Sequence, residues 1–158
     1  MNSMGESHRL LALVRTVEKE IHWLKKSDER LFSSGFNLLD MSTLDEQPDV
    51  ADKIEAFVAR FGRCQDTIGD KLLPVVLRWK GEKTLTVIDN LNRASRLGWL
   101  DSVELWVEAR NLRNQMVHEY VENAEELSAA LWRAHELLPT VIGTAIKLLA
   151  VATGEDQH

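Results

Sequence analysis

Apolar residues recur every three or four positions along most of the chain, which is the spacing that places them on one face of an α-helix. The first series covers Leu10–Leu31, with Asp28 filling its one polar position. The second covers Ile54–Leu72 and is expected to end near Pro74, because proline lacks the backbone N–H that a helix interior uses. These patterns predict two long amphipathic helices, joined by a loop over residues 33–48, where turn formers and acidic residues gather.

A short third helix is expected before a glycine in the middle of the chain. Leu85, Ile88 and Leu91 have helical spacing and form its expected apolar face. Gly98 is expected to close it, because glycine readily adopts the left-handed conformation found after many helices.

The last two expected helices begin at capping signals. Asp101 followed by Glu104 predicts the start of the fourth helix, which extends through the region of His118. Asn123 predicts the start of the fifth, which is expected to kink at Pro139. The apolar positions are Leu105, Ala109, Leu112, Met116 and Val117 in the fourth helix, and Leu127, Ala130, Leu131, Ala134, Leu138, Ile142, Ala145 and Leu149 in the fifth.

No segment alternates apolar and polar residues as a half-buried strand does. The sequence therefore predicts an all-α, up-and-down bundle of four to five helices. A chain of 158 residues is the length of one domain, so a single domain over residues 1–158 is expected, with a disordered tail over 154–158.

Composition and charge narrow the class of protein. With 44% hydrophobic and 28% charged residues, the chain is neither a disordered nor a low-complexity protein. Cys64 is the only cysteine and is expected in the core, so neither a disulfide nor a metal site is expected. The lack of a possible disulfide predicts a cytoplasmic location. A polar N-terminus and Lys147 within the apolar stretch Val141–Ala152 argue against export and membrane insertion. The net charge of −6 argues against indiscriminate nucleic-acid binding, and no DNA partner is expected.

One segment of the expected fourth helix combines side chains suited to RNA cleavage. It contains Arg113 and Asn114, then His118 after three residues, then Tyr120, the only tyrosine of the chain. An arginine five positions before a histidine arises easily by chance, but the added asparagine and tyrosine make the composite motif specific.

Cleavage of RNA without a metal needs a group that exchanges protons with the reacting oxygens and a cation that stabilises the charge developing on the phosphate. The imidazole of His118 and the planar guanidinium of Arg113 suit these two roles. Asn114 lies one turn before His118 and is expected to orient it. On a straight helix, five positions separate Arg113 and His118 by about 140°. A symmetric homodimer with its fourth helices face to face is therefore expected to bring both pairs to one cleft.

The motif, in a short helical chain with Trp106 one turn before Arg110, resembles the HEPN superfamily, and most closely its HepT-like toxin branch. The resemblance is dense over residues 98–120 and unspecific elsewhere. It implies a dimeric helical bundle with metal-independent endoribonuclease activity, with the motif arginine and histidine as catalytic residues and transfer RNA among the possible substrates. It also implies a minimal nucleotidyltransferase antitoxin, which uses ATP to add AMP to Tyr120; the chain itself is expected to need no cofactor.

Simpler interpretations stay open for the same residues. His118 is then a surface histidine, Arg113 forms an ion pair with a helical neighbour, and Tyr120 is half-buried with its hydroxyl in water. Two other function classes fit the pattern: a noncatalytic subunit that binds nucleotide or substrate for a nucleotidyltransferase, and a structural helical adaptor. The five tryptophans are expected in the core or in dimer contacts rather than as stacking platforms for bases: Trp23, Trp79, Trp99, Trp106 and Trp132.

The charge is unevenly distributed along the chain. Residues 71–96 contain six basic and two acidic side chains, a local charge of +4, so the remainder carries −10. If this segment lies beside the fourth helix, it supplies a positive surface that guides an RNA backbone to the motif. Arg93, Arg96 and Arg110 are the expected RNA-binding residues.

Overall fold

The computed structural model describes residues 3–33 and 43–154, with the side chains of Ser3 and of residues 119–122 excepted. Every regular element in these ranges is helical, which confirms the all-α expectation. The elements are α1 (Ser3–Ser33), a 3₁₀ turn η1 (Leu44–Glu46), α3 (Pro48–Asp66), a π-helical segment η2 (Thr67–Leu72), α4 (Leu73–Trp79), α5 (Val87–Arg96), α6 (Val103–Glu122) and α7 (Ala124–Thr153).

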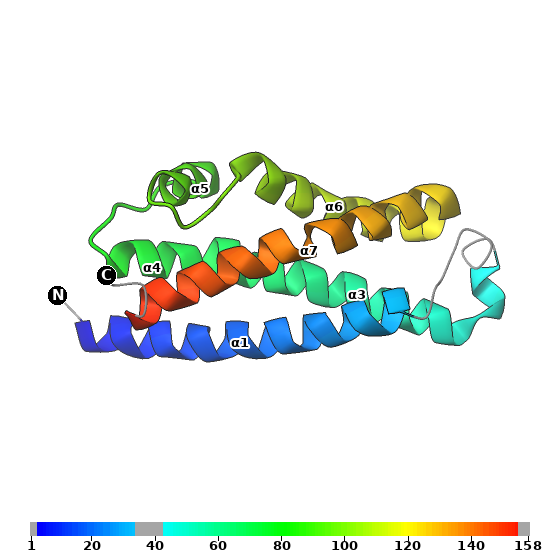
Figure 1. Cartoon of the computed structure of the whole chain (residues 1–158), viewed down its shortest axis with the longest axis horizontal. Helices are drawn as coiled ribbons and strands as arrows, with labels where there is room; N and C mark the ends of the chain where they lie inside the picture. Colours follow the sequence, from blue (N-terminus) through cyan, green and yellow to red (C-terminus); the bar gives the residue numbers. More distant parts are fainter. Residues whose placement is uncertain (1–2, 34–42, 155–158) are drawn as a thin grey trace.

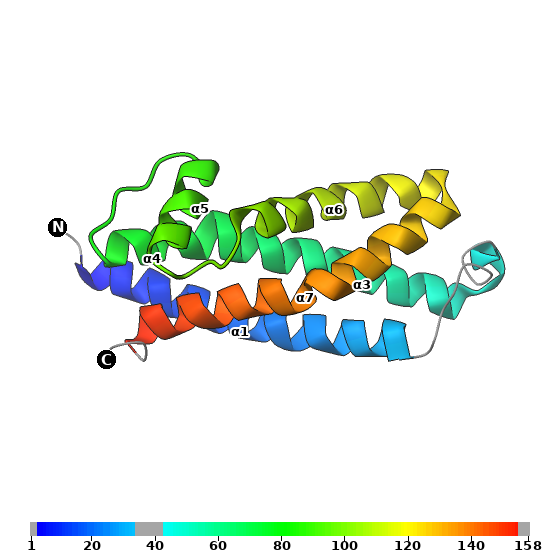
Figure 2. The same ribbon diagram turned by 45° about the horizontal axis from the view of Figure 1, so that its top comes forward.

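Four long helical stretches run along the length of the bundle in alternating directions (Figures 1 and 2). They are α1, the continuous run α3–η2–α4, α6 and α7. The short helix α5 lies across the end where α4 stops and α6 begins. This arrangement is the expected up-and-down bundle, with α5 as an addition at one end.

The apolar faces of α1 and α3 meet in the core, as their spacing predicts. All twelve expected positions are buried: Leu10, Val14, Val17, Ile21, Leu24 and Leu31 of α1, and Ile54, Phe57, Phe61, Cys64, Ile68 and Leu72 of α3 and η2. Burial raises the pKa of the Cys64 thiol to about 12, so this cysteine is a protonated core side chain at neutral pH.

By length and composition, the helix α7 could cross a membrane, since an 18-residue stretch of it has a mean hydropathy of 1.5. In the bundle its apolar face packs against α1, α4 and α6, where Leu131, Ala134 and Val141 are among the fully buried residues. Packing within the core therefore accounts for the apolar character of that face.

The helix that begins at Pro48 does not end near Pro74, as the sequence suggested, but continues to Trp79. Between its two α-helical parts the chain forms η2, where the N–H of Leu73 donates to the carbonyl of Ile68, five residues back. Pro74 falls in the first turn of α4, where a missing N–H breaks no α-helical hydrogen bond. The wider π turn thus lets the helix pass a proline that would otherwise end it.

The apolar face of α5 differs from the expected one. Leu85 precedes the helix and is 71% exposed, and Ile88 is 50% exposed. The buried residues are Leu91, Ala94 and the polar Asn90, whose side-chain oxygen accepts a hydrogen bond from the N–H of Leu85 at 3.0 Å. That hydrogen bond satisfies a buried polar group, and the buried face of α5 differs from the one that hydrophobicity alone favours.

Gly98 closes α5 as predicted. Its φ is +81°, and the N–H of Trp99 donates to the carbonyl of Ala94 at 2.9 Å, the hydrogen bond of a Schellman motif. The residue that caps α6 is Ser102 and not the expected Asp101. The Ser102 hydroxyl accepts a hydrogen bond from the N–H of Leu105 at 3.1 Å.

The hairpin between α6 and α7 is closed by a single residue. Asn123 caps α7, accepting from the N–H of Glu126 at 3.1 Å, which confirms the predicted cap. With so short a connection, α6 and α7 pack side by side in opposite directions (Figure 2). The helix α7 continues through Pro139 to Thr153. The expected loop falls mainly on residues 34–42, and all but Gly154 of the expected tail on residues 155–158; both stretches lie outside the described residues.

Candidate functional site

The motif residues of α6 point in two different directions. Arg113 faces α3 and packs so closely on Gly62 that a Cβ added there would lie 2.6 Å from the arginine Nε. His118 and Asn114 are exposed on the other side. These contacts agree with the separation of about 140° that five helical positions give.

Two ion pairs join α6 to the α3–η2 run. Arg113 Nη1 lies 2.6 Å from Asp66 Oδ2, and Arg110 Nη2 lies 3.6 Å from Asp70 Oδ2. Each side chain is about two-fifths exposed, and pairs exposed to this degree contribute about 0–1 kcal/mol to stability. The main effect of Asp66 is therefore to orient the Arg113 guanidinium. The ion pair of the simpler interpretation is therefore present, with its partner on another helix.

The outward face of α6 carries a polar row with some apolar surface beside it. At about 100° per residue, Val107, Asn111, Asn114 and His118 lie within about 60° of one another around the helix. Asn114 and His118 are separated by one turn, the spacing at which side chains on a helix touch. The exposed row thus presents two amides and an imidazole to whatever meets this face.

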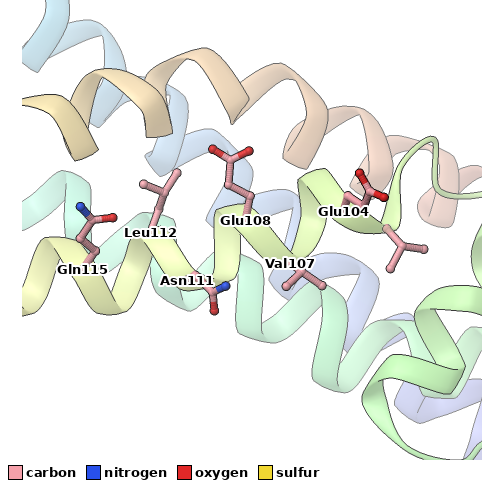
Figure 3. Close-up of a pocket in the computed structure, with 7 residues that line it drawn as sticks. Glu104, Val107, Glu108, Asn111, Leu112 and Gln115 are labelled. Carbon is pink, nitrogen blue, oxygen red and sulfur yellow. The ribbon is translucent and has the colours of Figure 1, made fainter.

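A shallow hollow of about 490 Å³ lies along this face and is lined by α6 alone (Figure 3). Val107 and Asn111 lie on its outward side, whereas Glu108 and Leu112 point toward α7. Arg133 of α7 donates two hydrogen bonds to the Glu108 carboxylate, at 2.6 and 2.9 Å, and these hydrogen bonds lower the pKa of Glu108. The Glu108 charge is thus balanced from α7.

Tyr120 lies in the last turn of α6, but its side chain falls outside the described part of the structure. Its expected role is therefore untested by geometry.

The expected RNA-binding arginines are not gathered around the motif. Arg93 forms an ion pair with Glu82, and Arg96 is exposed on the same short helix, α5. That helix lies at the start of α6, whereas His118 follows fifteen residues after Val103, roughly 22 Å further along the axis. Arg93 and Arg96 are therefore near the motif in sequence but distant from His118 in space. Of the three, Arg110 alone lies on α6, one turn before Arg113.

Sequence reasoning missed two partners that only packing brings into contact. Asp66 and Gly62 lie 47 and 51 positions before Arg113 and position it, and no motif marks them. A second cluster joins α1 to α7: the His135 Nδ1 lies 2.7 Å from Asp28 Oδ1, and its ring stacks on Phe32 at 4.2 Å between centroids. The polar position in the α1 stripe is thus explained by a histidine on another helix.

Within the described ranges, no group of three or more His, Cys, Asp or Glu side chains gathers closely enough to hold a metal ion. Comparison of the chain with protein-family models, with curated proteins and with solved structures finds no match.

Replacing Gly62 by alanine tests the close packing of Arg113. Because the new methyl group overlaps the arginine side chain, Gly62→Ala is expected to lower the free energy of unfolding by about 1 kcal/mol, as overpacking of about 1–3 kcal/mol exceeds the helix-propensity gain of up to about 1 kcal/mol. Urea denaturation followed by circular dichroism measures the change.

Gly143 provides the matched control, because it also lies inside a helix but an added Cβ would meet nothing within 4 Å. Gly143→Ala is expected to raise the free energy of unfolding by about 0.5–1 kcal/mol. Equal stability of the two variants would contradict the described packing of Arg113 on Gly62.

Proposed function

We propose that the chain is a homodimeric, metal-independent endoribonuclease toxin of the HEPN type, acting in the cytoplasm. The observation that carries this proposal is the division of α6: His118 and Asn114 are exposed on its outward face, while Arg113 is held against α3 by Asp66. A proton-transfer group and a phosphate-binding cation are both present, but one straight helix points them apart. Two copies with their α6 helices face to face bring the two His118 side chains to one cleft, while each Arg113 stays on the α3 side of its own α6.

In this proposal His118 of one copy removes the proton of a ribose 2′-hydroxyl, and the oxygen attacks the neighbouring phosphorus. The bond from phosphorus to the 5′-oxygen of the next nucleotide breaks, and that oxygen takes a proton from a second histidine, the His118 of the other copy. Arg113 stabilises the extra negative charge on the phosphate through the donors that Asp66 leaves available. Asn114 orients the imidazole from one turn away.

The outward face of α6 supports the dimer. Val103 and Val107 are half-buried there, and Asn111 and Gln115 expose amides, each with a donor and an acceptor suited to pairing across a twofold axis. The hollow along this face is open enough to receive the side chains of a second helix. Dimerisation through α6 also leaves α1 and α3 exposed for contact with RNA.

The second candidate function is a noncatalytic subunit that binds nucleotide or substrate for a nucleotidyltransferase. The Arg113–Asp66 ion pair favours it, because a guanidinium that a carboxylate already neutralises stabilises less of the charge that develops on the phosphate during cleavage. In this alternative the α6 motif binds without cleaving.

Incubation of the purified protein with total transfer RNA and with a messenger RNA, in the presence of EDTA, separates the two candidates. The nuclease is expected to produce discrete fragments, and its overexpression is expected to stop growth unless Arg113 or His118 is replaced by alanine. Intact RNA and harmless expression would favour the noncatalytic subunit. Light scattering on the same sample is expected to report a mass of two chains.

Tyr120 is proposed as the site at which a nucleotidyltransferase partner neutralises the toxin. Transfer of AMP from ATP to the tyrosine oxygen releases pyrophosphate and places a bulky anion two residues from His118, where it is expected to block RNA. After incubation with ATP and such a partner, mass spectrometry is expected to find one AMP on Tyr120 and none on Tyr120→Phe. Neutralisation without any modification of Tyr120 would show that the partner acts by binding alone.

A further inference from the structure

A narrow groove between α1 and α3 gathers cations around an exposed tryptophan. It has a volume of about 140 Å³ and is lined by Lys19, Glu20 and Trp23 of α1 and by Arg60 and Arg63 of α3. Three cations against one carboxylate give the lining a formal charge of +2, in a chain whose net charge is −6. The groove is therefore a positive site on an acidic protein, and it lies on neither α5 nor α6.

Two of these cations form no close ion pair with the described residues. Lys19 and Arg63 are exposed, and within the described part of the chain neither lies within 4.0 Å of a carboxylate oxygen. The carboxylate of Glu20 accepts a hydrogen bond from the Thr67 hydroxyl at 3.2 Å, and partial burial raises its pKa. Glu20 interacts with Arg63 by charge alone, so the groove keeps two exposed charged donors that no close ion pair in the described residues holds in place.

Trp23 is held as a platform beside these donors. The Arg60 guanidinium lies 5.3 Å from the centroid of its ring and also donates to the buried Ser27 hydroxyl at 2.6 Å. His22 meets the indole edge-on, at 5.2 Å between centroids. The indole is nevertheless 43% exposed, so Trp23 is not a core residue, and the other expected role, a dimer contact, stays a prediction. An aromatic ring fixed beside exposed cations is a combination that binds single-stranded nucleic acid.

We propose that this groove is a binding subsite for single-stranded RNA, with Lys19 and Arg63 contacting the phosphates and Trp23 stacking on a base. Its volume is below the range of about 300–1,000 Å³ of sites for free small ligands, which favours one unit of a longer strand over a free nucleotide. The inference rests on the proposed nuclease function and deepens it, since it assigns the substrate a path.

The groove is adjacent to the proposed catalytic arginine. Arg63 lies one turn before Asp66 on α3, and Asp66 holds Arg113. A strand that crosses α3 thus passes from Arg113 to Arg63 and then to Trp23. This path uses a face of α3 that the proposed dimer leaves exposed, and it replaces the basic residues of α5, which lie at the far end of α6 from His118.

Binding of a fluorescent oligo(dT) strand, followed by anisotropy over a series of salt concentrations, tests the subsite. The probe carries phosphates and bases but no 2′-hydroxyl, so the proposed nuclease chemistry cannot cleave it. In the double variant Lys19→Ala/Arg63→Ala, loss of two phosphate contacts is expected to reduce the slope of log K against log salt by about 1.4, at about 0.7 per contact for single strands. Trp23→Ala is expected to raise Kd about fivefold or more at fixed salt, whereas Trp23→Phe keeps most of the affinity.

Lys25→Ala is the control for loss of a lysine charge outside the groove, because Lys25 is exposed on α1 about 240° around the helix from Lys19. It is expected to change Kd and slope little. The subsite is overturned if wild-type protein does not bind the strand, or if the double variant, shown to be folded by its thermal melt, binds like Lys25→Ala. Binding by wild type without any RNA cleavage would instead refute the nuclease and leave the subsite standing.

Discussion

Replacing His118 by alanine is expected to lower the rate of RNA cleavage about 100- to 10,000-fold, the contribution typical of a general acid or base. His118 is exposed on the outward face of α6, so its loss is expected to leave the core unchanged. The measurement is the initial cleavage rate of a short RNA with a fluorophore at one end and a quencher at the other, at saturating substrate. The thermal melt of the variant is expected to match that of wild type.

His8→Ala is the matched control, since His8 is also exposed on a helix but lies on α1, outside the motif. Its cleavage rate is expected to equal that of wild type. Full cleavage by a folded His118→Ala variant would show that the imidazole takes no part in cleavage. The geometric argument for a dimer would then no longer hold. In growing cells the same variant is expected to be harmless on overexpression, whereas the His8 variant stays toxic.

Trp106→Ala is expected to lower the free energy of unfolding by about 3–5 kcal/mol, the loss typical of truncating a large aromatic residue in a core. Trp106 is 2% exposed and is the largest fully buried side chain in the described part of the structure. Its indole packs on the π-helical segment, where a Cβ added to Gly69 would lie 3.2 Å from the indole Nε1. Its carbonyl also accepts a hydrogen bond from the buried Gln65 amide at 3.3 Å. Truncation therefore leaves a cavity where α6 meets η2.

Urea denaturation compares this variant with Trp79→Ala, in which the tryptophan is 41% exposed at the end of α4. Because less apolar surface leaves the core, Trp79→Ala is expected to lose at most about half as much. Similar losses in the two variants would contradict the placement of Trp106 in the core. A large loss confined to Trp106→Ala would also explain why a tryptophan stands one turn before Arg110 without any need for contact with RNA.

The sequence by itself determined the helical class, most of the core and several helix ends. A stripe at three- and four-residue spacing is a local property, and the six α1 positions from Leu10 to Leu31 are buried as that spacing predicts. Gly98 and Asn123 act within a few residues of their own position, so their roles as helix caps were also predictable. The opposite directions of Arg113 and His118 on α6 follow from helical rotation alone.

Only the tertiary structure decided which side chains from different helices meet. The partner of Arg113 is Asp66, and the partner of Asp28 is His135, at separations of 47 and 107 positions that no local pattern encodes. The apolar spacing also did not encode the burial of Asn90 in α5 or the π turn that precedes Pro74. Periodicity identifies the buried face of each helix, but the polar contacts between helices depend on how the helices are packed, and these contacts define both the candidate catalytic site and the α1–α3 groove.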